Sequence, residues 1–400
     1  MDRKRFSANA AGSLMMVGQG AGQYAAFVPG PLPPQLPWGP ELFSALSEAD
    51  RALGELAGLG RNLPNPQLLM RPFMNREAVL SSRIEGTQAD VSDLYAFEAG
   101  QRTKTTPEDV QEVRNYVRAL QYGIERVDSL PVSLRLIREL HQQLMEGVRG
   151  GFATPGQFRR SQNWIGRPGC TVKDAVYVPP PVPEMNRSLE QLEHYLQTDT
   201  LYPPLVRLGL MHYQFEAIHP FVDGNGRIGR LLIVLLLVHW NLLPLPLLYL
   251  SAFFEKNREE YYERLLAVSE RGEWLQWLLF FLRGVAEQAR DAILRATRLH
   301  ELQAEWRSRL TQTRASALPL RLVDSLFETP LLTIPAASEL LKVTYSAAQK
   351  NVQKLVDAGI LKQLNPDAGY GKVFIASEIL QIVQGEAPPE RPGLQGGTGV

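Results

Sequence analysis

The chain has 400 residues, and its 42 lysine and arginine residues balance its 42 aspartate and glutamate residues. A length of this order favours two or three domains, and the balanced charge excludes a global electrostatic attraction to nucleic acid or acidic lipid. The single cysteine, Cys170, excludes an internal disulfide framework and a cysteine-rich zinc site, which favours a reducing, cytoplasmic location.

The first part of the chain changes from an extended segment to a series of helices. Prolines recur through residues 29–40, where they remove backbone donors and disfavour helix. Apolar residues at three- and four-residue steps then predict helices from Glu41 to Leu56 and from Leu68 to Ile84. Pro107 and Pro131 each precede a further apolar stripe, at the position where proline favours the start of a helix.

Residues 158–181 have a different pattern, in which β-branched and aromatic residues lie among glycines and prolines. This pattern predicts a short two-stranded flap. The longest apolar run, Leu231 to Val238, is far shorter than the roughly 20 residues of a membrane-spanning helix, so we expect no membrane association. After the flap, helical patterns cover a segment near Val182 and the segments 205–218, 226–240, 261–268, 274–285 and 286–310.

The C-terminal part is typical of a small separate unit. Helical patterns at 331–343 and 346–358 precede a strand at 373–375, an order of helix, helix and wing that resembles a winged helix. We therefore predict a mainly α protein with five parts, namely an N-terminal region of extended chain and helices (1–105), a helical core with the flap (106–285), a connector helix (286–320), a winged-helix-like domain (321–384) and a disordered tail (385–400).

One segment, H-P-F-V-D-G-N-G-R-I-G-R at residues 219–230, carries most of the functional signal. A glycine-rich turn opens directly onto a strongly apolar helix, which directs backbone N–H groups and the positive helix end toward an anion. Arg227 and Arg230 add positive charge suited to successive phosphates. The alternative is a helix N-terminus with incidental glycines. The joint occurrence of histidine, phenylalanine, an acid, Gly-Asn-Gly and two arginines at fixed spacing argues against it.

Two residues near this turn have side chains suited to phosphate chemistry. Asp223 offers a hard carboxylate oxygen of the kind that holds Mg²⁺ on phosphates. His219 has an unperturbed pKa of about 6.5 and is suited to take a proton from an attacking hydroxyl.

These residues match the signature of the Fic family, H-x-F-x-(D/E)-G-N-G-R-x-x-R, and the chain resembles that family over about residues 32–285. The resemblance implies a Fic-type helical core whose members move AMP from ATP onto a hydroxyl side chain of a target protein. It also implies a general base at His219, a Mg²⁺ ligand at Asp223 and further catalytic roles for Asn225, Arg227 and Arg230. The ATP-binding loop that it implies consists of Gly224, Asn225, Gly226, Arg227, Ile228, Gly229 and Arg230.

A second match lies upstream, where S-S-R-I-E-G at residues 81–86 fits the family's inhibitory pattern, (S/T)-x-x-x-E-(G/N). The pattern lies on the predicted helix at about residues 68–86 and marks Ser81 and Glu85 as inhibitory residues. A pair between Glu85 and Arg230 in a partly desolvated pocket would occupy the arginine that the γ-phosphate of ATP requires. The alternative is a surface glutamate in a polar turn.

Two less specific segments fit the same function. The flap at 158–181 resembles the family's flap, and its edge is suited to align a segment of a target protein by strand addition. Tyr261 resembles part of the family's adenine pocket, where its ring would stack on the base. The alternatives are a simple surface hairpin for the flap and core packing for Tyr261.

The remaining candidates carry weaker signals. The residues His141, His194, His212 and His300 show no metal-ligand clustering and are expected to be structural. Residues 330–381 hold five lysines and four acidic residues, a net charge of +1 that gives only weak support for DNA binding and leaves protein docking as an alternative. Apolar residues along the connector helix suggest a homodimer.

The sequence therefore predicts a protein adenylyltransferase that uses ATP and Mg²⁺, modifies a serine, threonine or tyrosine of a target protein and of itself, and is inhibited by Glu85. Three alternatives remain open. The same pocket could remove AMP from a modified target, or it could transfer phosphate or phosphocholine. The chain could also be a DNA-binding regulator in which the nucleotide site senses ATP.

Overall fold

The computed structural model describes residues 1–62, 67–98, 100, 103–127, 129–148, 154–198, 201–312, 317–364 and 371–385. The described chain is mainly α, as predicted. It forms two compact units, one of Met1–Pro66 and Phe73–Arg290 and the other of Gln67–Pro72 and Asp291–Val400. The predicted domain boundaries remain predictions. None of the described helices combines the length and the apolar character needed to cross a bilayer.

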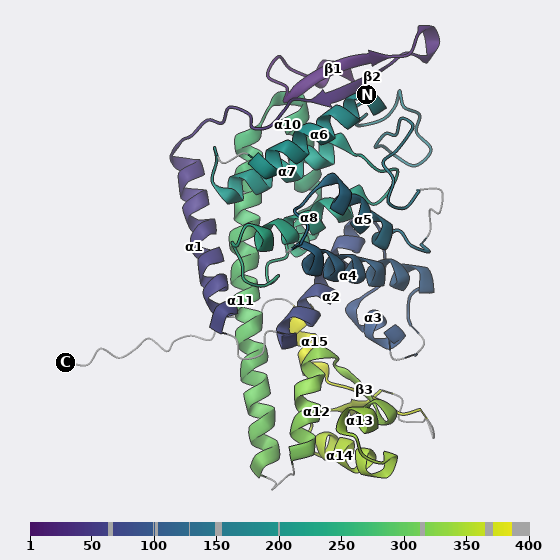
Figure 1. The fold of residues 1–400 in the computed structure, drawn as a ribbon, viewed down its shortest axis with the longest axis vertical. Helices are drawn as coiled ribbons and strands as arrows, with labels where there is room; N and C mark the ends of the chain where they lie inside the picture. Colours follow the sequence, from purple (N-terminus) through teal and green to yellow (C-terminus); the bar gives the residue numbers. More distant parts are fainter. Residues whose placement is uncertain are drawn as a thin grey trace, which may run out of the picture. The chain divides into compact units, whose positions relative to one another are not determined.

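The first unit contains a set of helices and an N-terminal hairpin (Figure 1). Its helices are α1 (Pro40–Asn62), α3 (Val91–Glu98), α4 (Pro107–Val127), α5 (Leu134–Leu144), α6 (Val182–Thr198), α7 (Pro204–Ile218), α8 (Asn225–His239), α9 (Ser251–Lys256) and α10 (Arg258–Arg271), together with most of α2 (Gln67–Ile84) and the first part of α11 (Trp274–Gln312).

Helix α8 lies in the core of this unit and positions the functional loop. Every residue from Leu231 to Leu237 is at most 1 % exposed, and the helix contacts α4, α5 and α7. Burying each such side chain contributes about 1.5–3 kcal/mol, so the helix is held firmly. The glycine-rich loop that precedes it is therefore anchored at its C-terminal end.

The N-terminal residues form a hairpin that the sequence did not predict. Short 3-10 turns at Arg3–Arg5 and Gly20–Gly22 accompany strand β1 (Gly12–Val17), which pairs antiparallel with β2 (Tyr24–Pro29). Strand β2 buries Ala25, Ala26 and Phe27, and the Phe27 amide donates to the carbonyl of Val178 at 2.8 Å. Because the residues of β1, G-S-L-M-M-V, do not alternate between polar and apolar types, no period-two pattern marks this strand in the sequence. The proline-rich segment after β2 is irregular, as predicted.

Residues 158–181 form the predicted flap with less strand than predicted. A single antiparallel bridge joins Ile165 and Tyr177, and it includes an Ile165 amide that donates to the Tyr177 carbonyl at 2.8 Å. Pro168 and the prolines at 179–181 lack the backbone donors that would extend the ladder. The flap is thus an irregular loop closed by one bridge.

Helix α11 is one continuous helix, whereas the sequence predicted two at 274–285 and 286–310. No proline or capping glycine separates the two patterns, so nothing ends the first helix. Gly284 lies inside α11, and a Cβ at that position would contact the ring of Phe253. This glycine therefore allows close packing and does not end the helix.

The second unit includes the C-terminal elements of the chain. Helix α13 (Ile334–Leu341) directly follows Thr333, and helix α14 (Tyr345–Asp357) directly follows Thr344. The side chain of each threonine caps the start of its helix. The other elements are α12 (Ala317–Glu328), β3 (Leu331–Thr333), β4 (Lys362–Gln363), β5 (Val373–Ile375) and α15 (Ser377–Gln384), and the strands form an antiparallel sheet in the order β3-β5-β4.

The order of these elements agrees with the predicted helix, helix and wing, and the assignment as a winged helix remains a prediction. Residues 365–370, which connect β4 and β5, lie outside the described residues. The predicted disordered tail also lies outside them beyond Gly385.

Candidate active site

The turn between α7 and α8 carries the predicted catalytic segment and is shaped by two left-handed residues. His219 ends α7 with a φ of 49°, and Gly224 precedes α8 with a φ of 80°. Glycine adopts a positive φ at little cost, whereas a histidine with a positive φ requires support from its surroundings. Gly224 also has no side chain to cap α8, so the first amides of the helix remain directed toward the loop.

Asn225 closes the loop through its side chain. Its Oδ1 accepts from the Phe221 amide at 2.8 Å, and its Nδ2 donates to the Phe221 carbonyl at 2.9 Å. The side chain is 2 % exposed and both of its ends are engaged. Asn225 therefore fixes the backbone of the predicted ATP-binding loop.

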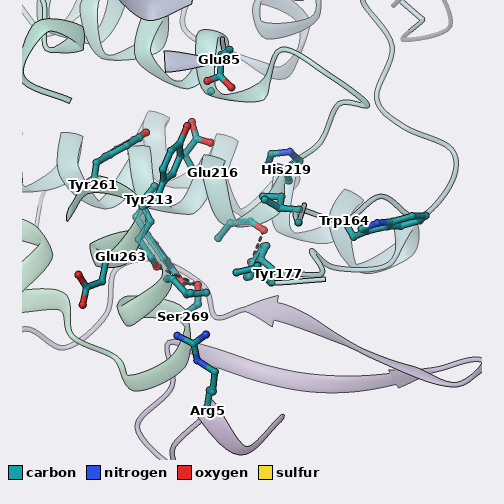
Figure 2. A pocket seen from close by; sticks show the side chains of 18 of the residues that line it. Arg5, Glu85, Trp164, Tyr177, Tyr213, Glu216, His219, Tyr261, Glu263 and Ser269 are labelled. Carbon is teal, nitrogen blue, oxygen red and sulfur yellow. Dashed lines mark hydrogen bonds between the residues drawn. The ribbon is translucent and has the colours of Figure 1, made fainter. Parts of the chain in front are cut away.

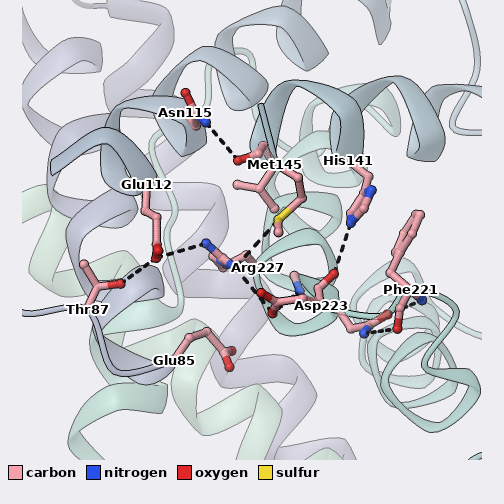
Figure 3. A network of polar contacts seen from close by, with 12 residues as sticks. Glu85, Thr87, Glu112, Asn115, His141, Met145, Phe221, Asp223 and Arg227 are labelled. Carbon is pink, nitrogen blue, oxygen red and sulfur yellow. Dashed lines mark hydrogen bonds and ion pairs between the residues drawn. The ribbon is translucent and has the colours of Figure 1, made fainter. Parts of the chain in front are cut away.

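His141 supports the same loop from α5, a role that the sequence did not reveal. Its Nδ1 accepts from the Gly156 amide at 2.9 Å, so the proton lies on Nε2, which donates to the Asp223 carbonyl at 3.0 Å (Figure 3). The ring stacks on Phe221 with a centroid distance of 3.7 Å. Burial lowers the pKa of His141 to about 4, which keeps the imidazole neutral in this clamp.

His219 has the properties of a base at neutral pH. Burial is the main cause that lowers its pKa to about 4, and the positive charge of Arg159 is the second. Among the described residues, no group hydrogen bonds to its buried Nδ1. The imidazole is therefore neutral at pH 7 and able to accept a proton.

Arg230 is held by the end of α2, as the upstream pattern predicted. Its Nη2 donates to Glu85 Oε1 at 2.7 Å and to the Ser81 carbonyl at 2.9 Å, and its Nε donates to Ser81 Oγ at 2.8 Å. The guanidinium is 1 % exposed. Burial works to raise the pKa of Glu85, but the charge and hydrogen bond of Arg230 outweigh burial and hold this pKa below its usual value.

Arg227 is part of a second polar network that links the loop to α4. Its Nη1 lies 3.4 Å from Glu112 Oε2, which also accepts from the Thr87 hydroxyl at 3.0 Å, and its Nη2 lies 3.6 Å from Asp223 Oδ1 (Figure 3). The sequence did not identify Glu112, because it lies far from the motif in the chain. Both arginines of the motif are thus paired with carboxylates.

A cavity of about 750 Å³ lies beside this loop. Figure 2 shows Glu85, His219, Glu216 and Tyr261 among the side chains that line it. This volume is within the usual range for small-molecule sites, about 300–1,000 Å³. Among the predicted site residues, Glu85, Gly226 and Arg230 line it together with His219 and Tyr261.

Tyr261 lies at the cavity wall and within the aromatic core. Its ring stacks on Phe254 with a centroid distance of 4.5 Å, and its hydroxyl lies 2.8 Å from His212 Nε2. Tyr261 is 1 % exposed, whereas the neighbouring Tyr262 lines the same cavity and is 42 % exposed. Stacking of adenine on Tyr261 remains a prediction.

Glu216 is a cavity residue that the sequence did not single out. Burial raises the pKa of its carboxyl to about 8, although Arg230 acts to lower it. Within the described residues, its buried Oε1 has no hydrogen-bond partner. The carboxyl group is therefore neutral at pH 7 and faces a cavity that also holds the paired charges of Glu85 and Arg230.

Asp223 has the surroundings expected of a Mg²⁺ ligand that acts together with a nucleotide. Its side chain is 55 % exposed, and its Oδ1 accepts from the Gly224 amide at 2.6 Å. No group of three or more metal-binding side chains exists among the described residues. Because Mg²⁺ on phosphates is commonly held by only one or two carboxylates, with phosphate oxygens and water as further ligands, a single exposed carboxylate fits this role.

Comparison with known proteins agrees with this geometry. Residues 43–125 match the family model described as Fic/DOC family N-terminal, and residues 131–237 match the Fic/DOC family model. The chain is similar to curated proteins named "Protein adenylyltransferase Fic", with 29 % identity over 177 residues in Drosophila grimshawi and 29 % over 176 residues in Drosophila virilis. Each match covers 43 % of this chain and 32 % of the relative, so the chain spans about a third of the length of these proteins.

Solved structures share the fold. A Fic family protein from Desulfovibrio desulfuricans G20 superposes with a TM-score of 0.56 and 21 % identity, over 86 % of this chain and 98 % of that one. Fic-1 from C. elegans (residues 134–508) gives a TM-score of 0.50 and 21 % identity, over 64 % of this chain and 73 % of that one. Residues 131–237, which contain the loop and both of its arginines, thus form a Fic/DOC family domain, and residues 43–125 before them form the family's N-terminal domain.

Proposed function

We propose that this protein is an ATP-dependent adenylyltransferase that transfers AMP to a serine, threonine or tyrosine hydroxyl of a target protein and of itself. The observation that carries the proposal is the juxtaposition, at one cavity, of a neutral imidazole with an anion-directed helix start and a buried arginine. Transferases named for this reaction are among the curated relatives. The proposed substrate is ATP, with Mg²⁺ on Asp223.

His219 and the loop divide the chemical work. His219 takes the proton of the attacking hydroxyl, and the hydroxyl oxygen forms a bond to the α-phosphorus of ATP. The bond from that phosphorus to the oxygen that bridges to the β-phosphate breaks, and pyrophosphate leaves. The amides of Asn225 and Gly226 stabilise the charge that develops on the phosphoryl oxygens, because the Gly224 amide already donates to Asp223 Oδ1. Asp223 would hold Mg²⁺, which would neutralise part of the phosphate charge.

Glu85 acts as a brake on this reaction because it occupies Arg230. The hydrogen bonds from Arg230 to Ser81 and Glu85 hold the guanidinium on α2, away from the γ-phosphate. Keeping 99 % of the molecules in this state requires only about 2.7 kcal/mol. The ion pair of the buried Arg230 with the partly exposed Glu85 and the two hydrogen bonds from Arg230 to Ser81 can together provide it. ATP then binds non-productively until Glu85 is displaced.

The flap gives the target protein a place to dock. Trp164, Ile165 and Val176 line the rim of the cavity and are 41–48 % exposed. An extended target segment paired along Ile165 would bring its hydroxyl toward His219.

The apolar residues of the connector helix that suggested a homodimer, among them Leu299, Leu302 and Trp306, are at most 1 % exposed within this single chain, so they give it no support. DNA binding by the C-terminal unit remains a proposal that rests on the sequence alone.

The direct test measures transfer of label from ATP labelled on the α-phosphate to the protein itself. We expect a faint signal from the wild type, a strong signal from Glu85→Gly and none from Glu85→Gly combined with His219→Ala. Gln88→Gly is a matched control, because it removes an exposed side chain from the same turn that, within the part of the chain that the structure describes, bonds only to the Gly86 carbonyl. It should label like the wild type.

ATP labelled on the γ-phosphate separates AMP transfer from phosphate transfer. AMP transfer leaves the γ-label in solution as pyrophosphate. Protein labelling from the γ-position, or equal labelling of the wild type and both variants from the α-position, would contradict the proposed reaction.

A further inference from the structure

Arg159 is a buried cation at the N-terminal end of the flap. Within the described residues, none of its hydrogen-bond partners is a carboxylate. The side chain is 2 % exposed. Burial lowers the pKa of its guanidinium to about 10, so it still carries its charge at neutral pH. Burying a charge in this way is costly unless hydrogen bonds compensate for the lost water, so the contacts of Arg159 define its role.

The contacts of Arg159 converge on the backbone of the catalytic turn. Its Nε donates to the His219 carbonyl at 3.0 Å, and its own amide donates to the Pro220 carbonyl at 2.9 Å. These two residues lie where α7 ends and the chain reverses, and His219 has a φ of 49°. Arg159 thus supplies the support that a left-handed histidine requires.

The same guanidinium also joins the two ends of the flap. Its Nη1 donates to the Ser161 carbonyl at 3.2 Å, and its Nη2 donates to the Pro180 carbonyl at 2.5 Å. Only the planar fork of arginine can reach three carbonyls in these directions, since lysine offers a single nitrogen. One side chain therefore connects both flap ends to the backbone of His219.

We propose that Arg159 is a positioning residue for His219, which fixes the imidazole for proton transfer and couples the flap to the base. The proposal rests on the proposed role of His219 as general base. Through the flap, seating of a target segment near Ile165 is transmitted to the backbone that carries His219.

The charge of Arg159 adds an electrostatic effect that a purely structural role would not produce. It lowers the pKa of His219, second to burial. The other charged groups that face His219 are Glu85 from α2 and Asp223 from the loop, and both act to raise this pKa. Arg159 is the cation that opposes them, and its charge adds to the larger effect of burial in lowering the pKa of the imidazole.

Two variants separate geometry from charge. In Arg159→Lys the charge remains and the fork is lost, and in Arg159→Met both are lost. In the Glu85→Gly background, we expect both to lower the self-labelling rate at saturating ATP by about 100-fold, with the ATP concentration for half-maximal rate unchanged. Arg160→Met is the matched control, because Arg160 is exposed and, among the described residues, its side chain bonds only to Gln157 Oε1. It should keep the parent rate.

The second readout needs no turnover. NMR titration of ring-labelled histidine in nucleotide-free protein reports the pKa of His219 directly, since the chain has only six histidines and His219→Ala assigns the signal. We expect this pKa to rise by about one unit in Arg159→Met and to stay at the parent value in Arg159→Lys and Arg160→Met.

Two results would overturn parts of the proposal. An Arg159→Lys variant with the parent rate would overturn the positioning role, and an unchanged His219 pKa in folded Arg159→Met would overturn the electrostatic one. If Arg159→Met fails to fold in thermal melts, the rate of Arg159→Lys still decides. The predicted pKa changes in a protein whose Glu85→Gly parent transfers no AMP would refute the proposed function and leave the electrostatic effect of Arg159 on His219 intact.

Discussion

At the scale of single residues, the cavity contains a glutamate, Glu216, whose pKa lies above that of a histidine, His219, which is the reverse of their usual order. Burial raises the pKa of Glu216 to about 8 and lowers that of His219 to about 4. Both side chains are therefore neutral at pH 7, and the charged residues that line the cavity are Glu85 and Arg230 together with Arg5 and Glu263. A triphosphate bound at the loop would meet Arg230 already paired with Glu85, which makes release of that pair the controlling event of the proposed reaction.

Ser81 offers a residue-scale test of the brake. Ser81→Ala removes the hydrogen bond from Arg230 Nε, and a bond to a charged group contributes about 1.5–3 kcal/mol. We expect self-labelling from α-labelled ATP to rise at least about tenfold above the wild type but to stay below that of Glu85→Gly. Ser82→Ala is the matched control, since the Ser82 hydroxyl is buried and makes no hydrogen bond within the described residues. Equal signals from the two alanine variants would count against the brake.

Residues that follow one another in the chain could be predicted, and residues that meet from distant elements could be predicted only where a family pattern marked them, as for Glu85 and Arg230. The loop at 219–230 was identified because its chemistry is local. Arg159, Glu112 and His141 escaped prediction, because they act on main-chain carbonyls or on partners far away in sequence. A carbonyl partner leaves no pattern of residue types, so no sequence signal marks such contacts.

At the scale of elements, α8 is positioned by close packing against α4. A Cβ at Gly123 of α4 would lie 2.8 Å from Leu235 Cδ1 of α8, which is closer than real side-chain contacts. We expect Gly123→Ala to destabilise the protein by about 1–3 kcal/mol through overpacking, measured by urea unfolding.

Gly54 in α1 provides the matched substitution. A Cβ there has no neighbour within 4 Å, so Gly54→Ala gains helix propensity and should stabilise by up to about 1 kcal/mol. If Gly123→Ala were as stable as Gly54→Ala, the close approach of α4 and α8 would be refuted.

Element boundaries show where helical periodicity was informative and where it was not. The helices with a clear apolar stripe, such as α4 and α5, were predicted from Pro107 and Pro131 within a few residues. The hairpin of β1 and β2 was missed, because its strands gave no regular alternation. The break predicted within α11 was wrong, because a change in polarity was interpreted as the end of a helix.

At the scale of the whole molecule, buried titratable groups set the pH dependence of stability. His141, His212 and His219 have pKa values lowered to about 4, 3 and 4, so the folded state binds fewer protons than the unfolded state below pH 6.5. Each histidine then costs about 1.4 kcal/mol per unit of falling pH. Glu77 and Glu216, raised to about 7 and 8, act in the opposite direction between pH 4.5 and 8.

The sum of these effects predicts a maximum of stability near pH 6.5. Stability falls toward pH 8 because the unfolded chain releases the proton that Glu216 retains, and it falls toward pH 4.5 because three histidines outweigh two carboxyls. The loss becomes steeper below pH 4.5, where the carboxyls no longer compensate. Thermal melts across this range check the curve, and Glu216→Gln should remove much of the loss between pH 6.5 and 8. A melting temperature that rises steadily to pH 8 would contradict the assignment.

The central claim is that the loop from Gly224 to Arg230 binds a nucleoside triphosphate once Glu85 releases Arg230. Isothermal titration calorimetry of ATP with Mg²⁺ into Glu85→Gly tests it most directly, with Glu85→Gly combined with Arg230→Ala as the comparison. We expect measurable heat and saturable binding for the first protein, and binding at least about tenfold weaker for the second, since a charge-assisted contact to the γ-phosphate contributes more than 1.4 kcal/mol. Absence of heat with Glu85→Gly, or equal affinity of the two proteins, would contradict the account.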